Sequence, residues 1–156
     1  MANNAELKVL LVEDDIASLA LLRKILSYLE FTDENIMVAH DSKEALDFWK
    51  DNQGWAHLLI TDFWSAGGKG GGNGIDLMKR LNIPTVVATA LHVEEYTATN
   101  EVVIGIERYQ KPKNSEFLEK HSLVTQLQPA VDKVLSRSTT PPSFNSSAEN
   151  VEKPAA

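Results

Sequence analysis

The sequence predicts a doubly wound α/β domain in which five parallel strands form one sheet between two layers of helices. Short apolar runs alternate along the chain with longer stretches of helical periodicity, the pattern of repeated β-α-β units. Two of the apolar runs end in acidic residues, as expected of strands that bring polar side chains to the carboxyl edge of a parallel sheet. With 43% hydrophobic residues, the 156-residue chain can form one buried core.

The first half of the chain follows this pattern closely. Strands are expected at residues 8–13, 36–39 and 57–62. Apolar spacing predicts a helix over 16–31, and Asp41 and Ser42 are suited to cap a second helix over 43–52. A glycine-rich loop over 65–73 leads to a short helix over 74–81, and the continuous apolar run 84–89 predicts a fourth strand covered on both faces.

The second half is patterned less regularly. Residues 93–100 have little apolar face and are read as a short helix, and residues 106–111 as the fifth strand. Residues 114–121 are expected to add a turn or two. Ser122 is then expected to cap a last helix, which Pro129 should kink or restart. The predicted organisation is a lead at 1–6, one domain at 7–136 and a disordered Ser/Pro-rich tail at 137–156.

Composition excludes several classes of function. A net charge of -7 argues against nucleic-acid binding, and the lack of cysteine excludes disulfides and thiolate metal sites. We see no secretory signal and no apolar run of membrane-spanning length, so we expect a cytoplasmic protein without membrane insertion. The glycine-rich loop is not a P-loop, because Lys69 is followed by Gly70 rather than Ser or Thr.

Polar residues stand at four of the expected strand ends. Glu13 and Asp14 follow the first strand, and Asp62 ends the third. Carboxylates that meet at one edge of the sheet favour a hard cation such as Mg²⁺. Thr89 ends the fourth expected strand and Lys111 ends the fifth.

In this order, these residues resemble those of the response-regulator receiver domain of two-component signalling, over about residues 8–135. The 22 residues from Thr89 to Lys111 agree with the family's usual separation. The resemblance implies a flavodoxin-like fold and a stand-alone, chemotaxis-regulator-like receiver. It also implies that Asp62 accepts a phosphoryl group from a histidine kinase or phosphotransfer protein, forming an acyl phosphate.

The same resemblance implies a Mg²⁺ (or Mn²⁺) cofactor. Asp14 and Asp62 would be direct ligands, Glu13 would act through water, and the backbone carbonyl of Trp64 would complete the protein ligands. The cation would neutralise the approach of a carboxylate to an anionic phosphoryl group.

Further roles follow for residues around the acceptor. By resemblance, Lys111 and the Thr89 hydroxyl would each bond a phosphoryl oxygen. Trp64 and Leu91 stand at two positions that tune access of the hydrolytic water, and their bulk predicts slow self-dephosphorylation.

The sequence departs from the family pattern in the expected fifth strand. Arg108 stands three residues before Lys111, where the family has an aromatic, and Tyr109 follows it on the opposite face. We therefore expect any phosphorylation-driven change to run through Arg108 or through the weak helix at 93–100. The loop between Asp62 and Gly74 is also longer than usual and lacks Met-Pro.

These observations predict a phosphoacceptor that promotes only its own phosphorylation and dephosphorylation and signals through protein contacts. One alternative is a pseudo-receiver that acts as an interaction module without phosphotransfer. Another is a Mg²⁺-dependent phosphohydrolase, which commonly needs a second acid two residues after the nucleophile, where this chain has Trp64.

Overall fold

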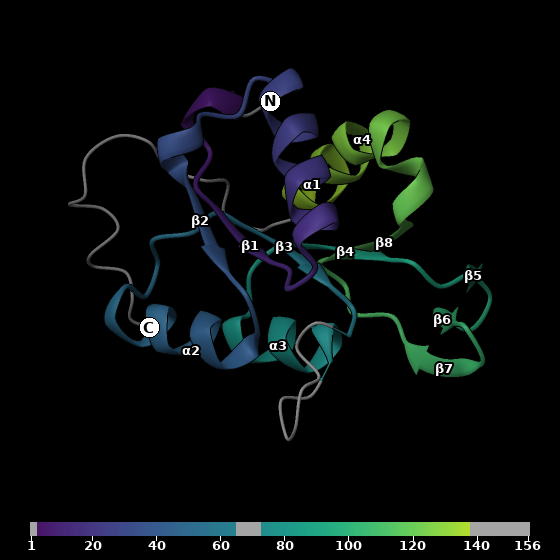
Figure 1. The fold of residues 1–156 in the computed structure, drawn as a ribbon. Coiled ribbons are helices and arrows are strands. Elements are labelled where there is room, and N and C mark those ends of the chain that lie inside the picture. Colours follow the sequence, from purple (N-terminus) through teal and green to yellow (C-terminus); the bar gives the residue numbers. More distant parts are fainter. Residues whose placement is uncertain (1–2, 65–72, 138–156) are drawn as a thin grey trace.

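The structure, a computed structural model, describes residues 3–64 and 73–137. Its main sheet has five parallel strands in the order β2-β1-β3-β4-β8 (Figure 1). The strands are β1 (Val9–Val12), β2 (Ile36–Ala39), β3 (Leu58–Asp62), β4 (Thr85–Thr89) and β8 (Ser115–Glu119). The predicted doubly wound α/β fold with a five-stranded parallel sheet is confirmed.

Helices cover both faces of this sheet (Figure 1). Helices α1 (Ile16–Tyr28) and α4 (Leu123–Ser136) lie on one face, and α2 (Ser42–Asp51) and α3 (Gly74–Leu81) lie on the other. Alternation along β1 explains the two cores, since Val9 and Leu11 pack under α1 and α4 whereas Leu10 and Val12 pack under α2 and α3. Each predicted helix up to residue 81 is present, with its ends shifted by a few residues.

The helix starts are set by acidic and amide side chains. Asp15 accepts a hydrogen bond from the Ser18 N–H at 2.8 Å, and Asp41 accepts one from the Glu44 N–H at 2.8 Å. Asn73 forms a capping box with Asp76 at the start of α3. These caps fix where the chain turns at the carboxyl ends of β1 and β2, and so where the acidic residues lie.

A second, antiparallel sheet occupies residues 93–110, and two predictions are wrong there. It consists of β5 (Val93–Tyr96), β6 (Glu101–Ile104) and β7 (Glu107–Gln110), so 93–100 is not a helix and 106–111 is not the fifth parallel strand. The physical reason is alternation in β6, where Val102 and Ile104 point inward and pack against Phe63 and Phe117.

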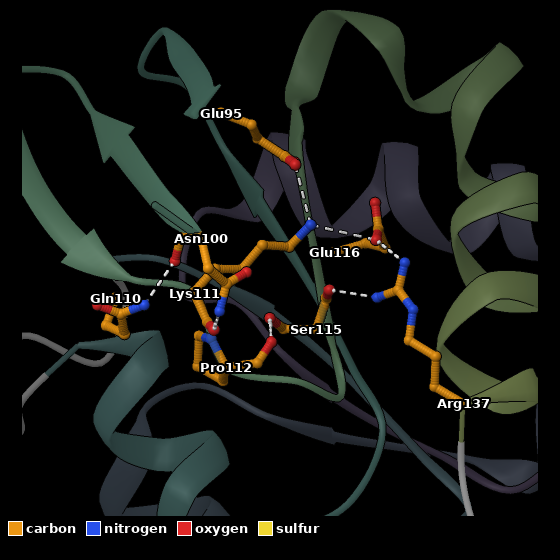
Figure 2. Close-up of polar contacts among 8 residues, drawn as sticks. All are labelled: Glu95, Asn100, Gln110, Lys111, Pro112, Ser115, Glu116 and Arg137. Atoms are coloured by element: carbon orange, nitrogen blue, oxygen red, sulfur yellow. Dashed lines mark hydrogen bonds and ion pairs between the residues drawn. The ribbon is translucent and has the colours of Figure 1, made fainter. Parts of the chain in front are cut away.

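The true fifth strand, β8, lies where one or two turns were expected. Its first residues are polar yet buried, which hides it from a search for apolar runs. Ser115 donates to the Pro112 carbonyl at 2.6 Å, and Glu116 is paired with Lys111 and Arg137 (Figure 2). Because these polar groups have partners, their burial is tolerated.

The last helix covers the main sheet beside α1. Helix α4 runs through Pro129 as one element, so the expected restart is wrong. Most of the glycine-rich loop (65–72) and of the tail (138–156) lies outside the described residues. Among the helices that the structure describes, none is long and apolar enough to cross a membrane.

Candidate functional site

Three charged side chains meet at the carboxyl edge of the main sheet. The Lys120 ammonium Nζ lies 2.9 Å from Glu13 Oε1 and 2.9 Å from Asp62 Oδ1. It also donates to Ser18 Oγ at 3.2 Å. The side chains of Glu13, Asp62 and Lys120 are only 1%, 13% and 19% exposed, so this is a nearly buried ion cluster.

The sheet topology explains why these residues meet. Strands β1 and β3 are neighbours with Val12 opposite Thr61, so the residues that follow, Glu13 and Asp62, emerge side by side. Strand β8 lies beyond β4 at the sheet edge, and Lys120 begins the 3₁₀ turn that follows it. The long Lys120 side chain reaches past the end of β4 to Asp62, and past the end of β3 as well to Glu13.

Burial and ion pairing shift the pKa values of Glu13 and Lys120 in this cluster. Burial raises the pKa of the Glu13 carboxyl, and this effect outweighs the attraction of the Lys120 ammonium and the hydrogen bond that the carboxylate accepts from the Asp15 N–H. For Lys120, burial opposes the charge, but the interactions with the carboxylates of Asp62 and Glu13 prevail and raise its pKa. Lys120 is therefore a permanent cation that stands between two acids.

The Asp62 carboxylate is oriented by the backbone just after β3 and by Lys120. Its Oδ2 accepts the backbone N–H of Trp64 at 2.9 Å, while Oδ1 faces Lys120. Its carbonyl oxygen accepts the Thr61 hydroxyl at 2.8 Å and lies 3.0 Å from where a Cβ on Gly74 would stand. Glycine at position 74 therefore allows α3 to begin directly against the end of β3.

Thr89 is placed next to this cluster, as predicted. It is the buried last residue of β4, one residue beyond the pairing of Asp62 with Ala88. Its Oγ1 accepts the N–H of Leu91 at 3.1 Å, which leaves the hydroxyl hydrogen available to donate. A hydroxyl donor beside an acidic nucleophile can bond an oxygen of a transferred group.

The predicted metal ligands are partly assembled. Glu13 and Asp62 converge, whereas Asp14 is solvent-exposed, and no three acidic or histidine side chains among residues 3–64 and 73–137 form a ready ligand set. The buried Glu13 Oε1 faces Lys120 but accepts no well-directed hydrogen bond. Hard oxygen donors with unused capacity fit a divalent cation such as Mg²⁺.

Lys111 does not belong to this site, which corrects the sequence prediction. Its Nζ lies 2.9 Å from Glu95 Oε1 and 3.3 Å from Glu116 Oε2, and Arg137 binds the same Glu116 (Figure 2). The cause is the misplaced fifth strand, because β8 ends at Glu119 and delivers Lys120 instead. Lys111 ties the second sheet to the main one.

Because the site lysine is Lys120, the residue three positions before it is Phe117 and not Arg108. Three residues before Lys120 stands Phe117, buried beneath Val102 and Ile104, so the assignment of Arg108 to that position is wrong. The signal was present in the sequence, where an aromatic and a lysine have the expected spacing. It was hidden because the second sheet lengthens the interval from Thr89.

The other predicted residues lie around the rim. Arg108 pairs with Glu101 at 2.9 Å on the outside of the second sheet. Tyr109 packs edge-on against Phe63, the residue after Asp62, with 5.4 Å between ring centroids. Burial and a hydrogen bond to Glu107 raise the pKa of Tyr109 to about 12, so it remains a neutral phenol.

Trp64 and Leu91 both expose their side chains, Trp64 next to Asp62 and Leu91 next to Thr89. The Trp64 ring packs edge-on against Phe63, and Leu91 lies against Gly105 at the turn of the second sheet. Their predicted influence on the phosphoryl lifetime stays a prediction.

Solved structures of response-regulator receiver domains share this fold. The N-terminal domain of a response regulator/sensory box/GGDEF 3-domain protein from Carboxydothermus hydrogenoformans superposes with a TM-score of 0.59 at 20% identity, covering 83% of this chain and 94% of that one. The PhyR response regulator REC domain of Erythrobacter litoralis gives 0.58 at 16% identity, covering 88% and 95%.

A CheY-like receiver domain from Methylobacillus flagellatus gives a TM-score of 0.56 at 16% identity, covering 82% of this chain and 98% of that one. No protein-family model and no curated protein matches the sequence. The structural similarity confirms the flavodoxin-like receiver fold that the resemblance implied. The chemistry rests on this chain's own residues.

Proposed function

We propose that this chain is a phosphoacceptor receiver domain of a two-component system, with Asp62 as the acceptor. The observation that carries the proposal is the buried cluster in which Lys120 contacts both Asp62 and Glu13 at the carboxyl edge of a receiver-like sheet. Thr89 adds a hydroxyl donor at the next strand end. The two-component context of the structural neighbours supports the same function.

The reaction follows from these groups. A carboxylate oxygen of Asp62 attacks the phosphorus of a phosphohistidine, the P–O bond forms, the P–N bond breaks, and the electron pair returns to the histidine nitrogen. Lys120 and the Thr89 hydroxyl are placed to bond oxygens of the transferred group, where negative charge must be stabilised. A bound Mg²⁺ would supply further charge neutralisation, held by Asp14 and Asp62 with support from Glu13 and the Trp64 carbonyl.

The surface beside the site suits a helical phosphodonor. Helix α1 begins two residues after Asp14 and exposes Ile16 and Leu21, apolar residues that the main core does not use. Exposed apolar side chains on a helix that begins beside an acidic acceptor fit contact with a histidine kinase or phosphotransfer protein. The chain would then act through protein contacts and would turn over no external substrate.

One observation favours a second candidate, the pseudo-receiver that works as a binding module. Phe117 is buried under Val102 and Ile104 of the second sheet, so it cannot change position unless that sheet moves. A domain with this aromatic locked would hold one conformation and bind its partner constitutively.

Intact mass after incubation with acetyl phosphate and Mg²⁺ tests the proposal. We expect the wild type to gain the mass of one phosphoryl group and Asp62→Asn to gain none. The matched control is Asp51→Asn, at the end of α2 and away from the site. A wild type without an adduct would favour the binding module, and continuous release of phosphate would favour the hydrolase.

A further inference from the structure

Glu119 lies at the junction of the two sheets, directly before Lys120. It is the last residue of β8 and is paired in register with Thr89, the last residue of β4. Its carboxylate Oε2 accepts the backbone N–H of Val93, the first residue of β5, at 2.8 Å. One side chain thus joins the end of the main sheet to the start of the second sheet.

Two histidines complete the surroundings of this carboxylate. His92 Nδ1 lies 2.9 Å from Glu119 Oε2, and His121 Nε2 lies 2.5 Å from Oε1. The Val93 N–H, followed by the bond from His121, lowers the pKa of Glu119, so the carboxylate stays ionised. Both oxygens therefore accept hydrogen bonds, and the side chain is only 22% exposed.

The segment that Glu119 holds also contacts Thr89. Leu91 donates its N–H to Thr89 Oγ1 at 3.1 Å, and the carbonyl of the next residue, His92, accepts the Gly105 N–H at 2.9 Å. Residues 91–93 are therefore fixed by Glu119 on one side and by the turn of the second sheet on the other. This fixed segment sets the direction of the Thr89 hydroxyl.

The backbone of Glu119 acts on the lysine. Its carbonyl oxygen accepts the Ser122 hydroxyl at 2.8 Å, closing the 3₁₀ turn that contains Lys120. Thr89 and Lys120 are the two groups placed to bond the transferred phosphoryl group. Glu119 contacts the segment that bonds Thr89 through its carboxylate, and it contacts the turn that contains Lys120 through its carbonyl oxygen.

We propose that Glu119 is a positioning residue for phosphoryl transfer: its carboxylate fixes residues 91–93 and thereby the Thr89 hydroxyl, beside Lys120, relative to Asp62. The inference rests on the proposed function and deepens it. Glu119 touches no reacting atom, and it acts through Thr89 and Lys120.

Single-turnover phosphorylation by acetyl phosphate with Mg²⁺ tests the proposal in Glu119→Ala, Glu119→Gln and the wild type. We expect Glu119→Ala to lower the rate constant about tenfold, because small misplacements of catalytic groups are costly. The half-saturating Mg²⁺ concentration and the final adduct yield should not change. Glu119→Gln keeps an oxygen for the Val93 N–H and should recover most of the rate.

A purely structural role gives a different result. Partial unfolding of Glu119→Ala would lower the fraction of protein that is phosphorylated without changing the rate constant of the remainder. The control is Glu34→Gln, an exposed acid in the 3₁₀ turn Asp33–Asn35 before β2, which should behave as the wild type.

Amide hydrogen exchange of the unphosphorylated protein provides a second readout. Exchange at Leu91 and Val93 should be faster in Glu119→Ala, while exchange in β1 stays as in the wild type. An adduct that forms at the wild-type rate in both Glu119 variants would overturn the inference and leave the proposed function standing. A wild type that forms no adduct would overturn the proposed function, and with it the positioning role of Glu119, whatever the exchange data show.

Discussion

Removing the Lys120 cation by Lys120→Met should destabilise the fold and should do so in a pH-dependent way. The substitution keeps most of the side-chain volume but leaves Glu13 and Asp62 facing each other without a counter-ion. At 2.9 Å, each ion pair has a gross attraction of about 6 kcal/mol at an effective dielectric constant of about 20, before the desolvation cost is subtracted.

The net loss is smaller than this attraction. Breaking a buried pair by removing one partner costs about 3–5 kcal/mol. Lys120 is 19% exposed, and burial already raises the pKa of Glu13, so this carboxyl can take up a proton and relieve the repulsion. We therefore expect a loss of about 2–4 kcal/mol in the free energy of unfolding at neutral pH.

Urea denaturation at several pH values is the assay. A carboxyl whose folded-state pKa is raised contributes stability that is present at low pH and is lost as the pH rises through that pKa. The deficit of Lys120→Met should therefore shrink as the pH falls from about 7 to about 5. Lys111→Met is the matched control and should cost only about 1 kcal/mol with little pH dependence, because Glu116 keeps Arg137 at 2.6 Å.

A deficit for Lys120→Met no larger than that for Lys111→Met would refute this reasoning. A deficit that stays constant across the pH range would also refute it. That result would mean that repulsion between the ionised Glu13 and Asp62 carboxylates does not cause the loss of stability.

Three further predictions concern the same edge of the sheet. Glu13→Gln should raise the melting temperature at neutral pH and lose this advantage near about pH 4, because burial raises the pKa of Glu13 and its ionisation weakens the fold as the pH rises; a lower melting temperature at neutral pH would contradict this. Gly74→Ala should cost about 1–3 kcal/mol in urea denaturation, because its Cβ would lie 3.0 Å from the Asp62 carbonyl oxygen, and a neutral effect would show that α3 can shift freely. Trp64→Asn combined with Leu91→Glu should shorten the lifetime of the phosphoryl group, followed by mass after the donor is removed; an unchanged lifetime would show that these side chains do not screen the acyl phosphate.

The sequence was sufficient for the main sheet up to residue 89 because burial there follows simple periodicity. Strand β4 is a continuous buried run, and the caps at Asp15 and Asp41 are visible as residue types at the right places. The three predicted groups Glu13, Asp62 and Thr89 follow from these elements, because parallel strands end at one edge.

The region after residue 89 could not be predicted in the same way. Strand β8 contains Glu116, a buried charge that depends on Lys111 and Arg137, and these partners come together only in the fold. The polar residue Glu116 interrupts the apolar run, so the hydrophobic pattern predicts no strand there. The second sheet is formed by four-residue strands whose inward positions, such as Val102, are identified only by contacts with distant residues.

The unrecognised second sheet explains why the sequence predicts Lys111, rather than Lys120, beside Asp62. Lys111 stands at the usual distance from Thr89 and precedes a proline, whereas Lys120 precedes His121. Spacing along the chain is a weak guide where a whole sheet is inserted between two strands. The ion pairs of Lys120 settle its position beside Asp62.

The most direct test of the account compares phosphorylation rates of Lys120→Met and Lys111→Met under one set of conditions. With acetyl phosphate and Mg²⁺, intact mass should show adduct formation near the wild-type rate for Lys111→Met and at least about a hundredfold slower for Lys120→Met, since one charge-stabilising donor is worth that much in transition-state stabilisation. The reverse order, or equal rates for the two variants, would contradict the claim that Asp62 and Lys120 form the acceptor site.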